Sequence, residues 1–209
     1  MRIFAITIGD TNAASTHYRI LQYLPMLAQA GMQITVVARE CLTLKHLQAM
    51  AQADVVINQK TLLPTLWRWA IRVVAKKLIF DWDDAVWTRP NDKRAGFTRW
   101  RVKNRLHGWL KSANKVFSAN SYLNAYALKY NRHAVVLPMA IDLEHFRPKA
   151  AKTFDPEAPI LGWAGAPQNL GYVAEHLEVL QKFLERHPKA KLKILCGEKP
   201  NWNIPFEHT

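Results

Sequence analysis

Short apolar runs alternate with amphipathic helical patterns along most of this 209-residue chain, and the alternation limits the folds it can adopt. The runs that predict strands are 2–8, 33–38, 54–58, 77–80, 115–118 and 133–137. Between them, apolar residues recur at helical spacing over 16–30, 42–51, 62–75, 97–111 and 122–130, and Gly31 has the place of a C-terminal cap. Strands and helices that alternate in this way predict an α/β fold with a doubly wound, parallel, Rossmann-like sheet.

The pattern breaks down after Pro138, where prolines and charged residues follow one another without helical or strand spacing. We predict a first domain over 1–142, a linker over 143–158 and the start of a second α/β domain over 159–209. The second region contains a predicted strand at 160–164, a helix at 170–186 and a strand at 191–196. A sheet usually needs about four strands or more, so we expect this region either to lean on the first domain or to be the truncated beginning of a larger one.

The composition excludes several classes of protein. Hydrophobic residues make up 49% of the chain, which is enough for a large core and argues against disorder. Cys41 and Cys196 are far apart and lie in or beside apolar segments, so we interpret them as reduced core residues. The eight histidines form no cluster typical of zinc sites. The first residues do not resemble a signal peptide, and we expect a cytoplasmic protein.

Three carboxylates follow the apolar run 78–80 in a chain whose formal charge is +13. They belong to Asp81, Asp83 and Asp84. In open α/β sheets the ligand crevice lies outside the carboxyl ends of the strands, so the sequence predicts that at least one of them serves a functional site. The alternative is that Asp83 or Asp84 caps the next helix or turn, which would account for only one of the three.

Other polar residues at predicted strand ends are candidates for the same crevice. The loop 9–16 contains Asp10, Ser15 and Thr16, and either hydroxyl could cap the first helix while its N–H groups stay free for a ligand. This loop lacks the G-x-G-x-x-G pattern, which counts against a nicotinamide or flavin cofactor. The remaining candidates are Arg19 (for a phosphate, or alternatively a surface ion pair), Lys60, and Ser118 with Asn120, for which ordinary turn chemistry is the alternative.

The positive charge is concentrated between Arg89 and Lys115, where nine Lys or Arg residues stand against one acid. Trp100 and Trp109 lie among them. A basic helix that carries tryptophan favours an anionic membrane surface, and a solvated helix face is the alternative. No nucleic-acid-binding module is recognisable, so nucleic acid is not favoured as a partner.

Several stretches resemble the retaining GT-B-fold glycosyltransferases of family four ("glycosyl transferases group 1"). VVLPMAID at 135–142, followed by FRP at 146–148, is similar to the P-n-G-v-D…F-x-P signature that ends the first domain in that family. KVFSANS at 115–121, IFDWDDA at 79–85, YRI at 18–20 and ILGWAG at 160–165 resemble further stretches of the family in the same order. Met139 and Ala140 replace the usual Asn-Gly, and the loop after Gly165 lacks the Arg and Lys that often grip the donor phosphates.

The resemblance implies transfer of a sugar, with retention, from a nucleotide-diphosphate donor to a glycan or lipid-linked acceptor in cell-envelope polysaccharide synthesis. It implies no metal and no cofactor. Asp83 and Asp84 would be catalytic, and Gly165 would permit close approach of the donor. The paired-glutamate motif of the family does not occur in these residues, so donor binding is expected to be weak or absent. The alternatives are an inactive binding module of the same fold and, from charge alone, a nucleic-acid-binding protein.

Overall fold

A computed structural model describes residues 1–88, 95–144, 146–147 and 155–209 of the chain. It divides into two compact units, Met1–Phe146 and Arg147–Thr209. The strands of the first unit are β1 (Arg2–Thr7), β2 (Gln33–Ala38), β3 (Val55–Gln59), β4 (Leu78–Trp82), β5 (Lys115–Ser118) and β6 (Ala134–Val136). Its helices are α1 (Ala14–Arg19), η1 (Leu21–Tyr23), α2 (Leu24–Gln29), η2 (Arg39–Cys41), α3 (His46–Gln52), α4 (Thr65–Val74), α5 (Gly96–Ser112) and α6 (Ser121–Leu128).

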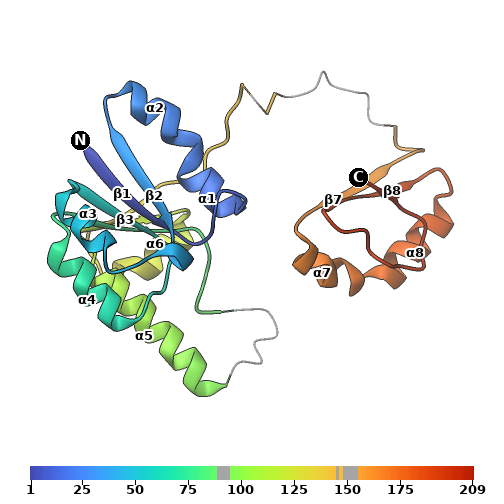
Figure 1. Ribbon diagram of the computed structural model, residues 1–209. Coiled ribbons are helices and arrows are strands. Elements are labelled where there is room, and N and C mark those ends of the chain that lie inside the picture. The colour runs from blue at the N-terminus through green and yellow to red at the C-terminus, as the bar shows by residue number, and fades with distance from the viewer. Residues whose placement is uncertain (89–94, 145, 148–154) are drawn as a thin grey trace. The chain divides into compact units, whose positions relative to one another are not determined.

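The six strands form one sheet in the order β2-β1-β3-β4-β5-β6, and every neighbouring pair is parallel. Figure 1 shows α1 and α2 on one side of this sheet and α3, α4 and α5 on the other. The predicted α/β fold class with a doubly wound parallel sheet is therefore confirmed. All six strands end at the same edge, so the loops that follow them meet there.

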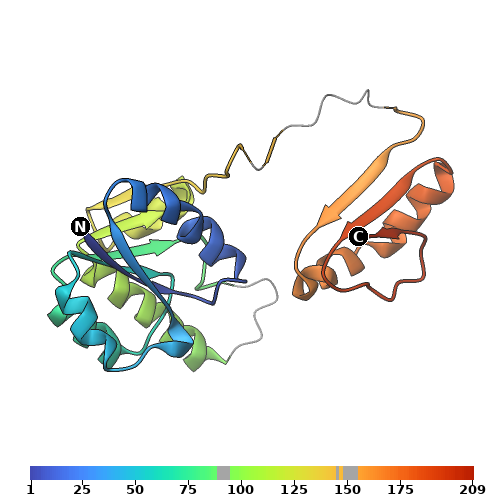
Figure 2. The ribbon, with the colours of Figure 1, turned by 45° about the horizontal axis from the view of Figure 1, so that its top comes forward.

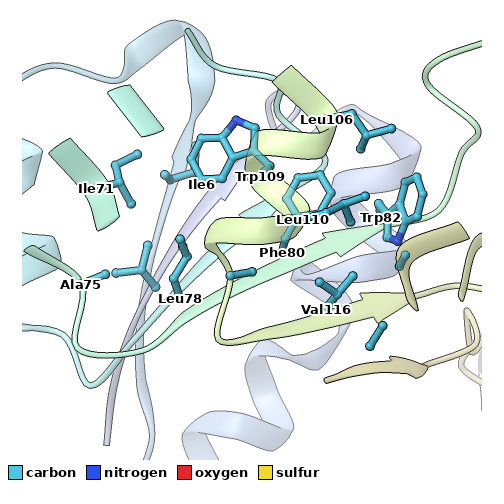
Figure 3. Close-up of a cluster of buried hydrophobic side chains, with 14 of the residues drawn as sticks. Ile6, Ile71, Ala75, Leu78, Phe80, Trp82, Leu106, Trp109, Leu110 and Val116 are labelled. Carbon is cyan, nitrogen blue, oxygen red and sulfur yellow. The ribbon is translucent and has the colours of Figure 1, made fainter. Parts of the chain in front are cut away.

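The main core lies between the sheet and helices α3 to α6 (Figure 3). Alternate residues of β4, such as Phe80 and Trp82, point to this face, and the Phe80 ring stacks on the ring of Trp109 from α5 at 6.2 Å. Ile71 from α4 is fully buried in the same cluster. The apolar runs that predicted the strands are the residues that fill this core.

The predicted helix 16–30 is three shorter pieces, α1, η1 and α2. Pro25 lies at the start of α2, where it has no N–H to donate and its ring would collide with a continuous helix. The last piece, α2, ends at Gln29, and Gly31 follows it in the expected place of a C-terminal cap, with a φ of 70° and its N–H donated to Ala28 O. The expected side-chain cap is absent from α1, because Ala13 holds the N-cap position in place of Ser15 or Thr16.

Strand β4 extends two residues beyond the predicted strand 77–80. Asp81 therefore lies inside the sheet, paired with Gln59 on β3 and Phe117 on β5, and only Asp83 and Asp84 follow the strand. Because side chains alternate along a strand, Asp81 points away from the main core, to the face that α1 covers.

The basic helix is observed as α5, but its two tryptophans have different surroundings. Trp109 is fully buried in the core and donates its indole N–H to Leu63 O, so it cannot belong to an interfacial face. Trp100 is exposed and its ring stacks on that of Phe97. The part of this prediction that concerns Arg89, Lys93 and Arg94 lies outside the described residues. No helix that the structure describes combines the length and apolarity needed to cross a bilayer.

The second unit has a small sheet of its own, β7 (Ile160–Ala164), β8 (Lys191–Leu195) and β9 (Glu207–His208), all parallel (Figure 2). The predicted helix 170–186 is divided into α7 (Leu170–Ala174), which follows η3 (Pro167–Asn169), and α8 (Leu177–Arg186). Leu192, Ile194, Cys196 and Ile204 are the buried centre of this unit. Cys196 is thus a free core residue as expected, whereas Cys41 is exposed and the expectation for it was wrong.

Candidate functional site

The carboxyl ends of β3 and β4 lie side by side in the middle of the six-stranded sheet. Gln59 at the end of β3 pairs with Asp81, and the N–H of Lys60 donates to Asp81 O at 2.7 Å. The next residues along each strand, Lys60 on one side and Asp83 and Asp84 on the other, are therefore brought together at the sheet edge. Residues far apart in the sequence meet here because parallel strands end at the same edge.

The Lys60 ammonium group is the centre of this cluster. Its Nζ lies 2.7 Å from Asp83 Oδ1, 2.5 Å from Asp84 Oδ2 and 2.9 Å from Ser15 Oγ. We call Ser15, Lys60, Asp83 and Asp84 the lysine cluster. It joins three elements, namely the start of α1 and the ends of β3 and β4. Burial alone would lower the pKa of Lys60, but Asp83 and Asp84 outweigh it and the pKa is raised above its usual value. Lys60 is therefore a cation at neutral pH.

The backbone of Lys60 is held in the left-handed region, with a φ of 43°. Among the described residues no other non-glycine residue has a positive φ, a conformation that costs about 1 kcal/mol for a residue with a Cβ. Asn58 and Thr61, both fully buried, enclose the turn: Asn58 Oδ1 accepts from the Thr61 N–H at 3.1 Å and from its hydroxyl, and Asn58 Nδ2 donates to Thr61 O at 3.0 Å. These hydrogen bonds fix the turn, and the Lys60 side chain points toward the residues that follow β4.

The two carboxylates of the lysine cluster differ in accessibility. The side chain of Asp83 is 6% exposed, whereas that of Asp84 is 67% exposed. Asp83 is therefore enclosed with Lys60, and Asp84 presents a carboxylate to solvent while the same ammonium group orients it. An accessible, oriented carboxylate can accept a hydrogen bond from a ligand hydroxyl.

Asp81 takes part in a separate ion pair. Arg19 from α1 contacts both oxygens of its carboxylate, with Nε 3.0 Å from Oδ2, and donates a third hydrogen bond to Leu137 O at 2.8 Å. Both side chains are almost completely buried. Burial raises the pKa of the Asp81 carboxyl, and Arg19 opposes the rise. These contacts occupy the guanidinium group that was predicted to meet a phosphate.

Gln59 was not predicted, although it lies beside the lysine cluster. Its side chain is fully buried, and its Oε1 accepts from the N–H of Ile8 at 2.9 Å, which ties the end of β3 to the loop after β1. Its Nε2 is buried without a partner among the described residues. Two polar residues in a row at the end of an apolar strand, Asn58 and Gln59, were the signal in the sequence that could have identified this turn.

The loop after β1 brings the remaining N-terminal candidates to the same edge. Asp10 is exposed and accepts from the N–H of Asn12 at 2.9 Å, and the buried hydroxyl of Thr16 donates to Gly9 O at 3.1 Å. A cavity of 460 Å³ lies beside this loop. Its lining includes Thr7, Gly9, Asp10, Thr11 and Thr16, together with apolar residues of η1, α2 and β2.

Other predicted residues have contacts that explain them structurally. Ser118 is buried and its Oγ accepts from the indole N–H of Trp82 at 2.9 Å, and Asn120 caps α6 by accepting from the N–H of Leu123. Gly165 leaves room for the ring of Trp163, which would lie 2.5 Å from a Cβ at that position. The part of the chain that the structure describes contains no group of three His, Cys, Asp or Glu residues arranged to hold a metal ion.

Comparisons with known proteins identify similar folds but no family. No protein-family model matches the sequence, and no curated protein matches it. Among solved structures, an alpha-glucosyltransferase in complex with UDP-glucose and DNA containing an abasic site has a TM-score of 0.57 and 13% identity over 94% of this chain and 57% of that chain. The alpha-glucosyltransferase in complex with UDP has a TM-score of 0.55 and 12% identity over 96% of this chain and 59% of that chain.

At this identity the likeness shows the fold alone, which is that of GT-B glycosyltransferases. This chain spans less than three fifths of the length of the solved structures it matches. Some of the similar structures are complexes with DNA, so the comparisons give no support to the expectation that nucleic acid is not a partner of this chain.

Proposed function

We propose that this chain is the acceptor-side part, with the beginning of the donor-side part, of a retaining glycosyltransferase of family four. The enzyme would use a nucleotide-diphosphate sugar and a glycan or lipid-linked acceptor. The observation that carries the proposal is the lysine cluster, which offers an oriented and accessible carboxylate at the carboxyl edge of a sheet with the GT-B fold. The resemblance of 135–142 and 79–85 to family motifs supports the same conclusion.

In sugar transfer the enzyme stabilises two developing charges of opposite sign at the same time. The bond between the anomeric carbon and the diphosphate oxygen breaks, so positive charge develops on the sugar and negative charge on the leaving diphosphate. A bond forms from the acceptor oxygen to the anomeric carbon, and the proton of the acceptor hydroxyl passes to an oxygen of the leaving diphosphate. A carboxylate near the anomeric carbon can stabilise the sugar and accept a hydrogen bond from the acceptor hydroxyl, while basic groups stabilise the diphosphate.

The accessibility of the two carboxylates suggests different roles for them. Asp84, with its exposed carboxylate, would receive the acceptor hydroxyl. Asp83 is enclosed with Lys60 and would position that ammonium group without touching the substrate. Lys60 and Ser15 would hold Asp84 in one orientation. Asp10 and Thr16 would contribute through the 460 Å³ cavity beside the first loop.

The remaining predictions extend this proposal. The domain limits 1–142, 143–158 and 159–209 follow from the loss of helical and strand spacing after Pro138, and the donor role of the second region with Gly165 follows from the family resemblance. Attachment to the cytoplasmic face of a membrane follows from the basic, tryptophan-bearing helix. A part in cell-envelope polysaccharide synthesis follows from the resemblance. The binding-module alternative differs only in the absence of turnover.

Ligand binding and turnover test the proposal together. Calorimetry and saturation-transfer NMR with UDP, UDP-glucose and a panel of oligosaccharides would measure binding to the whole chain. We expect at least one saccharide to bind saturably, and we expect Asp84→Asn to weaken it about tenfold or more because a charged hydrogen-bond acceptor is lost. Release of UDP in the presence of the acceptor would distinguish an enzyme from a binding module.

The matched control is Asp54→Asn, which removes the same charge from the residue before β3, at the opposite edge of the same sheet. It should leave saccharide binding unchanged. The proposal fails if no saccharide binds saturably, or if Asp84→Asn and Asp54→Asn behave alike.

A further inference from the structure

Helix α4 has one wide apolar arc, and the core covers only part of it. Ile71 is fully buried in the core, and Trp67 and Val74 pack against the same cluster. The rest of the arc exposes Leu66 (81% exposed), Trp69 (60%) and Val73 (80%), spaced so that they form one stripe along the helix. We call these three residues the α4 stripe. Only Thr65, Arg68 and Arg72 are polar in this helix of ten residues.

The apolar arc of a helix is normally covered along its whole width. The core accounts for one side of α4, and the neighbouring helix α5 lies along a second (Figure 1). Single exposed apolar residues are common on protein surfaces, but three large ones in a row point to an interaction surface. The α4 stripe therefore needs an occupant that is itself apolar.

The charge around the stripe indicates what that occupant is. No Asp or Glu occurs between Val55 and Phe80, and helices α3, α4, α5 and α6, which cover this face of the sheet, contain none. Arg72 precedes Val73 directly and lies about one turn from Trp69, and the exposed Lys76 and Lys77 follow the helix. Arg68 places its guanidinium 5.5 Å from the centre of the Trp69 ring. The surface is thus apolar in its middle and basic along one side and at its C-terminal end.

We propose that the α4 stripe docks onto a bilayer that contains anionic lipids. Leucine, valine and tryptophan would enter the boundary between headgroups and acyl chains, and the surrounding Arg and Lys side chains would contact lipid phosphates. With ten residues α4 is about 15 Å long, which is too short to cross a bilayer but suits a helix that lies in its surface.

Two other occupants fit the surface less well. Nucleic acid would engage the basic residues, but Leu66 and Val73 offer nothing to a phosphate backbone. A second copy of the chain packed across the stripe would bring Arg72 and Lys76 close to equal charges. Of these three occupants, a lipid surface alone satisfies the apolar and the basic side chains together.

The surface is also well placed for the candidate site. Helix α4 begins at Thr65, shortly after Lys60 at the carboxyl edge of the sheet, so its first turn lies at the same edge as the lysine cluster. A bilayer at the α4 stripe would hold lipid-linked molecules near that edge. The docking itself does not require sugar transfer, and the two are tested separately.

Vesicle sedimentation of the whole chain tests this inference. The probes are vesicles of phosphatidylcholine alone and with about 30% phosphatidylglycerol, at about 0.1 M salt. We expect binding to the anionic vesicles only. The variant Leu66→Ser/Trp69→Ser/Val73→Ser should bind the anionic vesicles at least about tenfold more weakly, since the apolar contact is lost. All three side chains are exposed, and circular dichroism would verify that the variant is folded.

The control variant Met26→Ser/Val179→Ser removes exposed apolar side chains elsewhere, 66% and 67% exposed, and should bind like the unaltered chain. The inference is overturned if the chain does not bind anionic vesicles, or if the stripe variant binds them equally well. It is also overturned if vesicle binding stays unchanged in the stripe variant while another property is lost. That property would be binding to duplex DNA, or dimerisation of the unaltered chain where the variant is a monomer. Saccharide binding in solution does not involve the stripe and should survive in this variant.

Discussion

Two groups of ion pairs lie at the same edge of the sheet, and their carboxylates all come from residues 81–84, at the end of β4. The two groups differ in how far they are open to solvent. Asp81 is paired with Arg19 in a closed arrangement that buries both side chains. Lys60 pairs with Asp83 and Asp84 in an arrangement that is buried at one end and open at the other, because Asp84 is 67% exposed. One carboxylate has every neighbour supplied by the protein, and the other faces solvent.

The difference teaches how to separate a structural charge from a candidate functional one. Strand alternation turns Asp81 toward α1, where Arg19 fills its hydrogen-bonding capacity. Beyond the end of β4 the alternation no longer applies, and Asp84 is free to point outward. Removal of a closed pair should affect stability, whereas removal of an open carboxylate should affect binding and leave stability nearly unchanged.

The largest effect is expected from Arg19→Met. This change leaves the buried carboxylate of Asp81 without a counter-charge, which costs about 3–5 kcal/mol of unfolding free energy. Urea unfolding of the whole chain would measure it. In the double variant Arg19→Met/Asp81→Asn the unpaired charge is gone, and at least half of the loss should be recovered. A single variant within about 1 kcal/mol of the unaltered chain would contradict a closed, structural pair.

The second effect concerns the turn that holds Lys60. Asn58→Ala removes the three hydrogen bonds to Thr61 and leaves buried groups without partners, which should lower the unfolding free energy by about 2–3 kcal/mol. Asn114→Ala is the matched control, because this exposed asparagine accepts from the N–H of Leu78 at the opposite edge of the sheet. The control should cost less. Equal losses of unfolding free energy would show that the hydrogen bonds between Asn58 and Thr61 contribute no more to stability than an exposed one.

The sequence predicted the fold well where apolar runs define buried strands. The strands at 33–38 and 115–118 have the predicted bounds. Strand β4 was predicted two residues too short, since a carboxylate argues against a buried strand unless its partner is known. That partner, Arg19, lies 62 residues away in the sequence.

The site was predicted in part. Strand ends placed Lys60, Asp83 and Asp84 at one edge, and the structure brings these three together with Ser15. Their roles stay predictions. Asn58 and Thr61 were missed because the sequence shows polar residues at the end of an apolar run but does not show that they enclose Lys60. The α4 stripe was missed for a related reason: the sequence shows a wide apolar arc on this helix but does not show how much of it the core covers.

The third effect tests the strain that the turn holds. At residue 60 a glycine should be more stable than an alanine by about 1 kcal/mol, because a φ of 43° suits a residue without a Cβ. The variants Lys60→Gly and Lys60→Ala both lack the ion pairs, so their difference isolates the backbone. In a helix the order should reverse, and Ala125→Gly in α6 is expected to cost about 1 kcal/mol. Equal stability of the two residue-60 variants would remove the argument for strain.

The fourth effect is the stability change of Asp84→Asn, which we expect to stay below about 1 kcal/mol because exposed ion pairs contribute little. Asp83→Asn should cost more, since its side chain is enclosed with Lys60. Urea unfolding of both variants would compare them directly. A larger loss for Asp84 than for Asp83 would mean that the open end of the lysine cluster is structural after all.

The last and smallest expected effect is a change of stability with pH. It compares the pH dependence of the unfolding free energy of the unaltered chain with that of Lys60→Met. Arg19 keeps its charge at any accessible pH, whereas Lys60 can lose its own. The pKa of Lys60 is raised in the folded chain above 10.5, so its contribution to stability is fully present below 10.5 and is lost as the pH rises through the folded value. Lys60→Met cannot titrate, so its deficit in unfolding free energy against the unaltered chain should narrow as the pH rises above 10.5, as measured by urea midpoints. A deficit of Lys60→Met that widens with pH would mean that Asp83 and Asp84 do not stabilise the ammonium form.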